Sequence, residues 1–477
     1  MAFNNDLNTK IVATVGPASS SYEKLLELVH NGVSVFRLNF SHGSHEDHQN
    51  TIEKITRINR ENGLHISILA DLQGPKLRVG KIENNGLEIK EGDILTFTKE
   101  ECLGTKEKIY MSYELFARDV EPGEKVLVDD GKLVLEVIET NKIDTVKLRV
   151  LFGGVLSSNK GVNLPNTKIS LPSLTEKDLN DLEFILKQPV NWIALSFVRS
   201  ADDLIDLQRR IDEKGHPAKI ISKIEKPEAV AELDKIIKHS NAIMVARGDL
   251  GIEVPMEQLP VIQKDIIRKC MQRARPVIVA TQMMDSMITN PSPTRAEITD
   301  VANAVLDGAD ALMLSGETSV GAHPAKVVQA MKKIIQETEK HYYVEDKKPV
   351  PSDKSRTFFS DVVCQNAAET ANQVGAKAIV GMTSSGYTAF KVSSFRPNAK
   401  IIIFSDRMHM LSTLSLVWGV QCFYYDKFTT TDDTINDVTE ILKKENIVQT
   451  DDIVINTGSM PLHRRFRTNM MKLTIIE

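Results

Sequence analysis

Residues 219–249 of the chain have the sequence KIISKIEKPEAVAELDKIIKHSNAIMVARGD, which predicts a strand, a helix and a second strand. The two ends of the stretch are short apolar runs, and the middle has apolar residues at the spacing of one helix face. Side chains two apart on a strand point the same way, so the first strand carries Lys223 and Glu225 on one face. A lone pair of this kind is usually a strand-end ion pair, and the rest of the chain must decide whether it is more.

Apolar runs of this kind alternate with amphipathic segments along the chain. The amphipathic segments have helical spacing and often end at a glycine, which suits a helix C-terminus. Strands that alternate with helices form parallel sheets, and eight such units predict a closed (β/α)8 barrel. The eight runs are residues 10–16, 33–41, 65–72, 191–198, 219–225, 242–249, 276–282 and 309–317.

Two regions depart from this alternation. Residues 75–170 lack helical spacing and instead show strand alternation with Asn-Gly, Glu-Gly and Asp-Gly turns, which predicts a small all-β lid domain inserted after the third barrel strand. A polar, proline-containing linker precedes residues 346–477, where strands and helices predict an open-sheet α/β domain. The barrel would then comprise residues 1–74 and 171–345.

Composition excludes several classes of protein. The chain has 477 residues, of which 42% are hydrophobic, and a net charge of −5 with basic and acidic residues mixed, so we expect no nucleic-acid partner and no membrane partner. No apolar run approaches the ~18 residues of a membrane span, and the N-terminus lacks the apolar core of a signal peptide. The four cysteines lie far apart, without metal-site or disulfide spacing. These features predict a soluble, cytoplasmic protein.

Polar side chains gather where the predicted barrel strands end. Active sites of such barrels form at the C-terminal ends of the strands. Any single polar residue there could be a helix cap or an ion pair, but seven of the eight strands bring polar groups to one rim, which indicates a functional site. The residues are Arg37, Asn39, Ser41, Asp71, Ser196, Lys223, Glu225, Arg247, Asp249, Thr281, Gln282, Ser315 and Glu317.

The residue types on this rim suit phosphoryl transfer. Glu225 and Asp249 end consecutive strands, and two carboxylates with water can hold Mg²⁺ or Mn²⁺. Arg37 and Lys223 add the positive charge that a transferring phosphoryl group requires. The glycines beside Asp249 leave backbone N–H groups free to receive an anion. Thr281 could supply a hydroxyl for hydrogen bonding or proton relay, with Ser315 and Glu317 behind it.

Six ordered motifs make the chain resemble pyruvate kinases over nearly its whole length. This resemblance implies a barrel with a lid and an effector-binding C-terminal domain, and transfer of the phosphoryl group of phosphoenolpyruvate to ADP, giving pyruvate and ATP. The motifs are RLNFSHG (37–43), GVNLP (161–165), ISKIE (221–225), MVARGDLGIEVP (244–255), TQMMDSM (281–287) and LDGADALMLSGET (306–318).

The resemblance also implies a role for each matching residue. Glu225 and Asp249 resemble the divalent-metal ligands, and Lys223 resembles the residue that neutralises the phosphoryl group in flight. Further implied contacts are Arg37 with the substrate phosphate, Gly248 and Asp249 with the substrate carboxylate region, Thr281 with the enolate carbon, and Arg78, Lys160, Asn39 and His42 with the nucleotide. A G-x-x-x-x-G-K-[ST] loop is absent from the sequence, so we expect nucleotide binding without a Walker fold.

The chain differs from most familiar members of the family beside the expected potassium pocket. That pocket would be formed by Asn39, Ser41, Asp71 and the carbonyl of Leu72, and those members carry a threonine at Leu72 and a glutamate at Lys76. A lysine brings its own positive charge on a flexible stem, so one fixed ammonium can replace one bound ion. We therefore expect K⁺ not to be required.

Regulation is expected at the C-terminal domain. MTSSGYTAF (382–390) lies between a predicted strand and a helix, where hydroxyls and helix N-terminal amides can bind phosphate. The resemblance implies a sugar-phosphate effector there, and also a homotetramer. The expected effector residues are Thr383, Ser384, Ser385, Gly386, Thr388 and, from the partner loop at 458–469, Arg464.

Two other functions compete with this interpretation. A barrel lyase or mutase acting on pyruvate or phosphoenolpyruvate would also hold Mg²⁺ on strand-end carboxylates, but the lid with Arg78 and Lys160 argues against it. A catalytically silent sugar-phosphate sensor would be expected to lose Lys223, Glu225 or Asp249, and all three are present.

Overall fold

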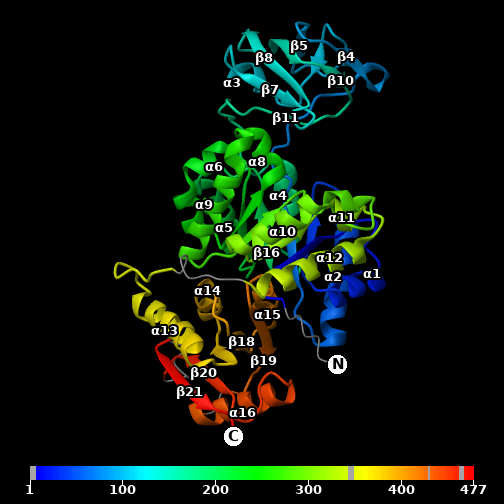
Figure 1. The fold of residues 1–477 in the computed structure, drawn as a ribbon. Helices are drawn as coiled ribbons and strands as arrows, with labels where there is room; N and C mark the ends of the chain where they lie inside the picture. The colour runs from blue at the N-terminus through cyan, green and yellow to red at the C-terminus, as the bar shows by residue number, and fades with distance from the viewer. Residues whose placement is uncertain (1–6, 342–348, 428–429, 461–466) are drawn as a thin grey trace.

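The molecule has three parts arranged in a row (Figure 1). The computed structural model describes residues 7–341, 349–427, 430–460 and 467–477. A closed parallel barrel lies in the middle, with a small all-β domain beyond one end and an α/β domain against the other. The predicted fold class, a (β/α)8 barrel with an inserted all-β domain and a C-terminal open-sheet domain, is confirmed. The boundaries at 74/75 and 170/171 stay predictions, and the boundary at 345/346 falls outside the described residues.

The barrel closes in the strand order β1-β16-β15-β14-β13-β12-β3-β2, with every neighbouring pair parallel. Each strand follows one of the eight predicted runs. The strands are β1 (Lys10–Thr14), β2 (Val33–Asn39), β3 (Ser67–Asp71), β12 (Trp192–Leu195), β13 (Lys219–Ile224), β14 (Ala242–Ala246), β15 (Val277–Ala280) and β16 (Ala311–Leu314).

Helices surround the barrel and begin and end where the sequence supplies capping residues. Helix α2 begins with a capping box at Ser44 and ends at Gly63, whose φ of +62° suits glycine. Thr294 caps α10 in the same way. The helices are α1 (Tyr22–His30), α2 (His45–Asn62), α4 (Glu176–Ile185), α5 (Ala201–Glu213), α6 (Pro227–Ala231), α7 (Leu233–His239), α8 (Arg247–Glu253), α9 (Leu259–Gln272), α10 (Arg295–Asp307), α11 (Gly316–Ser319) and α12 (Pro324–Glu339), with 3-10 turns η2 (Met256–Gln258) and η3 (Asp285–Ile288).

Several barrel strands end one to three residues earlier than the apolar runs suggest. Strand β14 ends at Ala246, and Arg247, Gly248 and Asp249 form the first turn of α8 instead. The first turn of a helix leaves backbone N–H groups without intrahelical partners. The loop after β14 therefore presents N–H groups as well as side chains at the end of the barrel.

One face of β13 lines the inside of the barrel. Ile221 lies in the interior apolar cluster, so Lys219 and Lys223, two residues before and after it, point into the two ends of the barrel. The rest of this interior cluster is apolar. Its buried members include Val12, Val35, Leu69, Trp192, Ala194, Met244, Ile278 and Met313.

The inserted domain is built from two sheets with its own apolar core. One sheet has the order β11-β7-β8-β9-β5-β6 and the other pairs β10 with β4. The hairpin between β7 and β8 turns through Asp129, Asp130 and Gly131, all with positive φ, as the Asp-Gly signal predicts. The elements are η1 (Glu83–Asn85), β4 (Leu87–Ile89), β5 (Ile94–Thr98), β6 (Ile109–Tyr110), α3 (Phe116–Asp119), β7 (Lys125–Val128), β8 (Leu133–Thr140), β9 (Thr145–Phe152), β10 (Gly154–Leu156) and β11 (Val162–Asn163).

The C-terminal domain is a five-stranded sheet in the order β19-β18-β17-β20-β21, parallel except for its last strand. It packs against the N-terminal ends of the barrel strands: the Trp192 indole donates to the Thr413 carbonyl (3.2 Å), and Arg396 pairs with Asp310 (3.1 Å). The elements are α13 (Phe358–Val374), β17 (Ala378–Met382), α14 (Tyr387–Ser394), β18 (Lys400–Ser405), α15 (Met408–Leu414), β19 (Val420–Tyr424), α16 (Thr431–Lys444), β20 (Ile453–Gly458) and β21 (Met470–Ile475).

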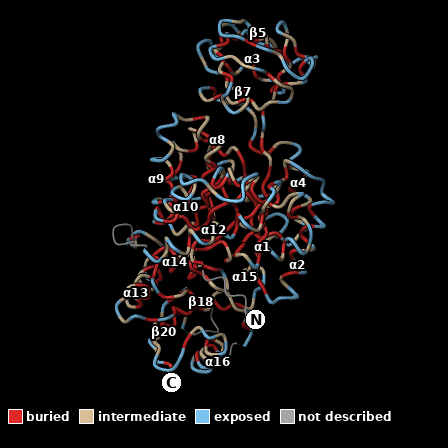
Figure 2. The backbone as a smooth tube through the Cα atoms, turned by 45° about the vertical axis from the view of Figure 1, so that its right-hand side comes forward, coloured by how far each residue is buried: buried red, intermediate tan, exposed pale blue. Residues whose placement is uncertain are grey.

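Buried backbone is concentrated in the barrel, and exposed segments lie mainly along the loops and outer helices (Figure 2). All four cysteines are unpaired. In the part of the chain that the structure describes, no helix combines the length and apolar character needed to cross a bilayer.

Candidate active site

A cluster of four charged side chains lies at the C-terminal end of the barrel. The Lys223 ammonium lies 2.9 Å from Glu225 Oε1 and 3.4 Å from Asp71 Oδ1, and it donates to Ser196 Oγ (2.7 Å). Arg37 donates through Nε to Asp71 Oδ2 (2.7 Å). The side chains of Asp71 and Glu225 are 1% exposed, so these contacts form in a water-poor place. The structure thus joins residues from β2, β3 and β13 that the sequence placed on one rim.

Pairing rather than burial sets the charge states of this cluster. Burial alone would lower the pKa of Lys223, but the carboxylates of Asp71 and Glu225 raise it above its usual value. Burial alone would raise the pKa of Asp71, but the charges of Lys223 and Arg37 hold it below its usual range. Both groups are therefore ionised at neutral pH.

Glu225 and Asp249 are the two carboxylates of the predicted metal site. Burial raises the pKa of Glu225, Lys223 opposes that rise, and the negative charge of Asp249 adds to it, so the two carboxylates are electrostatically coupled. Glu225 Oε2 accepts from the Phe197 amide (2.7 Å), which fixes the carboxylate, and Asp249 is half-buried at the start of α8. One buried carboxylate and one that is half-buried, at the ends of consecutive strands, fit a hydrated divalent cation. Among the described residues, clusters of three or more His, Cys, Asp or Glu side chains are absent, so water or substrate would have to complete the coordination.

Thr281 follows β15 in an unusual backbone conformation. Thr281 has a φ of +70° and Gln282 a φ of +54°. A positive φ is rare for a β-branched residue such as threonine. The Thr281 hydroxyl accepts from the Gly248 amide (2.7 Å) and donates to the Ala280 carbonyl (2.6 Å). These contacts join the ends of β14 and β15, and they place Thr281 beside the turn that carries Gly248 and Asp249.

Ser315 and Glu317 lie under the loop after β16. Glu317 is 1% exposed and accepts hydrogen bonds from the backbone amides of Ser315 (2.7 Å) and Met284 (3.2 Å). Burial raises the pKa of Glu317. The buried Ser315 hydroxyl has no hydrogen-bond partner among the described residues. The contacts of Glu317 are those of a residue that positions two loops, and its predicted catalytic part stays a prediction.

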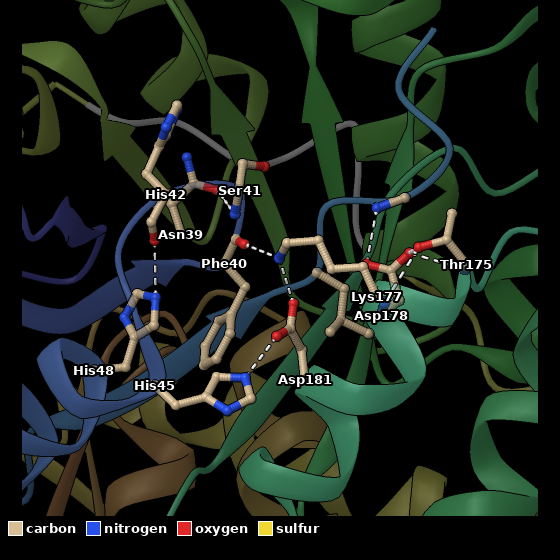
Figure 3. A network of polar contacts seen from close by, with 12 residues as sticks. Asn39, Phe40, Ser41, His42, His45, His48, Thr175, Lys177, Asp178 and Asp181 are labelled. Carbon is tan, nitrogen blue, oxygen red and sulfur yellow. Dashed lines mark hydrogen bonds and ion pairs between the residues drawn. The ribbon is translucent and has the colours of Figure 1, made fainter. Parts of the chain in front are cut away.

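Asn39, Ser41 and His42 lie on the loop from β2 to α2 (Figure 3). Asn39 Oδ1 accepts from the Ser41 amide (3.1 Å), and the His42 side chain is exposed. Lys177 of α4 fastens this loop by donating to the Phe40 carbonyl (2.6 Å). The same ammonium pairs with Asp181 (2.6 Å), which also contacts His45 Nε2 (2.7 Å). His45 is the first residue of α2, and its ring is held there by Asp181.

Of the residues of the expected potassium pocket, Asn39 and Ser41 lie on this loop, and Asp71 and Leu72 lie at the end of β3. Lys76 lies apart from them. The Leu72 carbonyl accepts from the Ser196 hydroxyl (2.7 Å), whose oxygen receives the Lys223 ammonium. Lys76 is exposed and lines a crevice between the barrel and the inserted domain together with Asp249. The structure therefore places Lys76 on the Asp249 side of the site.

Arg78 and Lys160 belong to the inserted domain and are engaged there. Arg78 donates to the Asn159 carbonyl (2.8 Å), and Lys160 pairs with Asp129 (2.8 Å). The backbone of Arg78 pairs with that of Gly161, the residue after Lys160. This pairing lies next to the chain segments that join the inserted domain to the barrel. They lie together, but within the inserted domain rather than at the charged cluster.

Sequence reasoning missed the residues that hold these parts in place. Asn163 of the inserted domain donates to Glu253 Oε1 (2.8 Å), and Lys226 pairs with the same oxygen (2.7 Å) in a buried contact. Thr14 accepts from Arg37 (3.0 Å). Asn163 and Glu253 stand inside motifs already singled out, which is the signal that could have found them.

The expected effector loop follows β17. The Gly386 amide donates to the Thr383 hydroxyl (2.9 Å), and Gly386 has a φ of +81°. The buried Thr388 hydroxyl meets that of Thr468 (2.6 Å), and Ser385 is exposed. Ser384 lies on the same loop, and its carbonyl accepts from Arg407 (3.2 Å). Arg464 lies outside the described residues.

Comparisons with known proteins agree over the whole chain. The barrel domain of pyruvate kinases matches residues 7–328, and their alpha/beta domain matches residues 361–474. The chain is 42% identical to a pyruvate kinase of Geobacillus stearothermophilus, over 98% of this chain and 80% of the relative, and 42% identical to one of Corynebacterium efficiens, over 98% of both. A crystal structure of a pyruvate kinase from Cryptosporidium parvum superposes with a TM-score of 0.92 at 36% identity, covering 99% of this chain and 96% of the other.

Proposed function

The chain belongs to the pyruvate kinase family and is a phosphotransferase of that type, and on this premise we propose that its barrel rim transfers the phosphoryl group of phosphoenolpyruvate to ADP. The observation that carries the proposal is the cluster of Lys223, Glu225, Asp71 and Arg37. In it, two paired cations and the buried Glu225 carboxylate share one water-poor site. Transfer of a phosphoryl group requires fixed positive charge of this kind.

Arg37 and Lys223 would hold the phosphoryl group. The guanidinium of Arg37 is oriented by Asp71 and Thr14, which leaves its outer nitrogen to face a ligand. The raised pKa of Lys223, where carboxylate pairing outweighs burial, keeps the ammonium charged. A fixed ammonium stabilises charge on the phosphoryl oxygens without reorganising during the reaction.

Thr281 would lie beside the carbon that gains a proton. When phosphoenolpyruvate loses its phosphoryl group, the enolate carbon must be protonated to give pyruvate. The Thr281 hydroxyl donates to the Ala280 carbonyl, so Thr281 would orient a water molecule that gives its proton to this carbon and regains one from solvent.

Glu225 and Asp249 would hold the divalent metal, which we propose is Mg²⁺ or Mn²⁺. When bound, such an ion would supply positive charge beside the phosphoryl group and polarise the substrate. Glu225 is held for this by the Phe197 amide. The family generally uses a divalent metal.

A coupled assay with phosphoenolpyruvate, ADP and Mg²⁺ tests the activity. The proposal predicts one ATP formed for each pyruvate, with both absent when ADP or the metal is omitted. Pyruvate formed without ATP would indicate a lyase or phosphatase and would contradict the proposal.

We propose that activity does not require K⁺. The support is the Leu72 and Lys76 pair of the sequence, which brings a positive charge where most familiar members of the family carry a glutamate. The test measures turnover against K⁺ at fixed ionic strength, with tetramethylammonium as the replacement cation. We expect near-full activity of the parent chain without K⁺ and a K⁺ requirement in Lys76→Glu. A rise of more than about tenfold with K⁺ in the parent would overturn the substitution argument.

We propose regulation by a sugar phosphate at the loop of Thr383, Ser384, Ser385, Gly386 and Thr388. Its support is a hydroxyl-rich turn before α14, with exposed Ser385 and a glycine at positive φ. A phosphorylated sugar should shift the phosphoenolpyruvate saturation curve, and Thr383→Ala should reduce the shift. An unchanged shift in Thr383→Ala would move the effector elsewhere.

We also propose a homotetramer in the cytoplasm. The support is membership of the family and four cysteines that remain unpaired in the described structure. Light scattering on the eluting protein checks the assembly. A monomer or dimer at micromolar concentration would contradict it.

A further inference from the structure

A cavity of about 580 Å³ lies between the N-terminal end of the barrel and the C-terminal domain. On the barrel side it is lined by Lys219 at the start of β13 and Arg275 just before β15. On the other side it is lined by Tyr387, Phe390 and Lys391 of α14. The volume falls in the range of small-molecule sites. The cavity shares no lining residue with the charged cluster around Lys223, which lies at the opposite end of the barrel.

The lining carries more positive than negative charge. Its charged members are five basic residues and one carboxylate: Lys219, Lys238, Arg273, Arg275, Lys391 and Asp361. Asp361 is already engaged, because it accepts from the Tyr387 hydroxyl and from Thr357 (3.1 Å) and pairs with Lys391 (3.3 Å). Arg273 is paired with Asp234 (3.2 Å) outside the lining. Lys219, Lys238 and Arg275 therefore remain uncompensated by the described residues.

Lys219 and Arg275 are the half-buried members of this set. In the described part of the chain neither side chain has a hydrogen-bond or ion-pair partner. The Lys219 ammonium lies 5.8 Å from the centre of the Phe390 ring, where the ring face attracts a cation. Burial, followed by the charge of Arg275, lowers the pKa of Lys219. Two like charges held together in a partly desolvated place are unfavourable unless an anion joins them.

We propose that this cavity binds a phosphorylated small molecule, with its phosphate between Lys219 and Arg275 and its body against the rings of Phe390 and Tyr387. A phosphate monoester carries close to two negative charges and several acceptor oxygens, which suits one ammonium and one guanidinium better than a single carboxylate does. The volume leaves room for an organic body beyond the phosphate.

The proposed site differs in place from both sites assigned to the family resemblance. It faces away from the substrate rim, and of the expected effector residues only Ser385 is among its described lining residues, whereas Thr383, Ser384, Gly386 and Thr388 are not. Because Lys219 and Arg275 belong to the barrel and Tyr387 and Phe390 to the C-terminal domain, a bound phosphate ester would bridge the two domains. Binding should therefore raise the thermal stability of the full chain.

The test is calorimetric titration of the full chain with inorganic phosphate and with glycerol 3-phosphate, using glycerol as the uncharged match at constant ionic strength. All titrations use an Arg37→Met background, which removes the expected phosphate contact at the substrate rim. We expect phosphate and glycerol 3-phosphate to bind and glycerol not to bind. Adding Lys219→Met or Arg275→Met should weaken binding by at least about tenfold, since each removes one charge-assisted contact.

Two further variants keep the outcome decisive. Lys219→Arg retains the charge and should bind within about threefold of the background, so a loss in Lys219→Met cannot be ascribed to misfolding. Thr383→Ala should leave this binding in place. Absence of phosphate binding, undiminished binding in both Lys219→Met and Arg275→Met, or a loss confined to Thr383→Ala would each overturn the proposal. Turnover is not a readout here, so these results are independent of the proposed catalytic function.

Discussion

Strand β13 carries a lysine near each end, and the two lysines share one face of the strand but differ in their partners. Lys223 at the C-terminal end lies against Glu225, Asp71 and Ser196. Lys219 at the N-terminal end lies over the Phe390 ring and beside the cation of Arg275. Both are largely removed from water, yet the pKa of Lys223 is raised and that of Lys219 is lowered. The neighbours of a buried lysine, rather than its place on the strand, decide the direction in which its pKa shifts.

This difference between the partners of the two lysines suits the two ends of the barrel to different functions. At the C-terminal end, fixed and compensated charges can act on a reacting phosphoryl group because they are already oriented. At the N-terminal end, uncompensated charges favour whatever anion can reach them. The first arrangement is suited to chemistry and the second to binding, and the following changes would break or sharpen that contrast.

The largest effect is expected from Lys223→Met. Loss of one preorganised charge in a water-poor site should lower kcat by about 10³-fold while phosphoenolpyruvate still binds. Steady-state kinetics give kcat, and a separate titration gives substrate affinity. The matched control is Lys214→Met, whose exposed ammonium pairs only with Glu183 on the surface and should leave kcat within about twofold. A fall of less than tenfold in Lys223→Met would remove this residue from the transfer step.

A smaller effect is expected from Asp249→Asn. The change removes one anionic ligand from the Glu225 pair, so the Mg²⁺ concentration for half-maximal activity should rise by about tenfold or more. Binding of Mn²⁺, followed by electron paramagnetic resonance without substrates, should weaken in parallel. Asp202→Asn, at an exposed position on α5, serves as the control. Unchanged Mn²⁺ affinity in Asp249→Asn would discard this carboxylate pair as the metal site.

The smallest effect is expected from the titration of Lys10, a buried lysine that lies at the N-terminal end of the barrel. It donates to the carbonyls of Leu7 (3.0 Å) and Val420 (3.1 Å), and burial lowers its pKa to about 8, against the opposing charge of Glu339. Between pH 8 and the unfolded value near 10.5, the unfolded chain keeps a proton that the folded chain has lost. The free energy of unfolding should therefore rise by roughly 2 kcal/mol from pH 8 to pH 10.

Urea unfolding at pH 8, 9 and 10 measures this rise. Lys10→Met cannot titrate and should lack it. A free energy that stays flat in the parent chain, or rises equally in Lys10→Met, would show that burial of Lys10 does not control its protonation.

Much of the fold could be predicted from the sequence because it is encoded by periodicity. The alternation of apolar runs with helical segments identified all eight barrel strands, and Asp-Gly turns identified the hairpin at Asp129 in the inserted domain. The exact strand ends were less predictable. The predicted run extends to Asp249, but the strand stops at Ala246, because Arg247, Gly248 and Asp249 already form the first turn of α8.

The candidate site could be predicted in its members but not in its pairing. The sequence placed Lys223 and Glu225 on one face, but Asp71 as a second partner of Lys223 depends on how β3 and β13 meet across the barrel. The basic cavity could not be predicted from the sequence either, because it depends on how distant segments pack. Its cations come from segments as far apart as Lys219 and Lys391, so no run of basic residues marks it.

The measurement that tests the contrast most directly is the pKa of the two lysines of β13. Nuclear magnetic resonance of the full chain with labelled lysine side chains follows each ammonium against pH, with Lys219→Arg and Lys223→Arg assigning the two signals. The account predicts that Lys223 keeps its proton above the ordinary lysine range and that Lys219 loses its proton below it. Equal pKa values, or a lower pKa for Lys223 than for Lys219, would contradict the account.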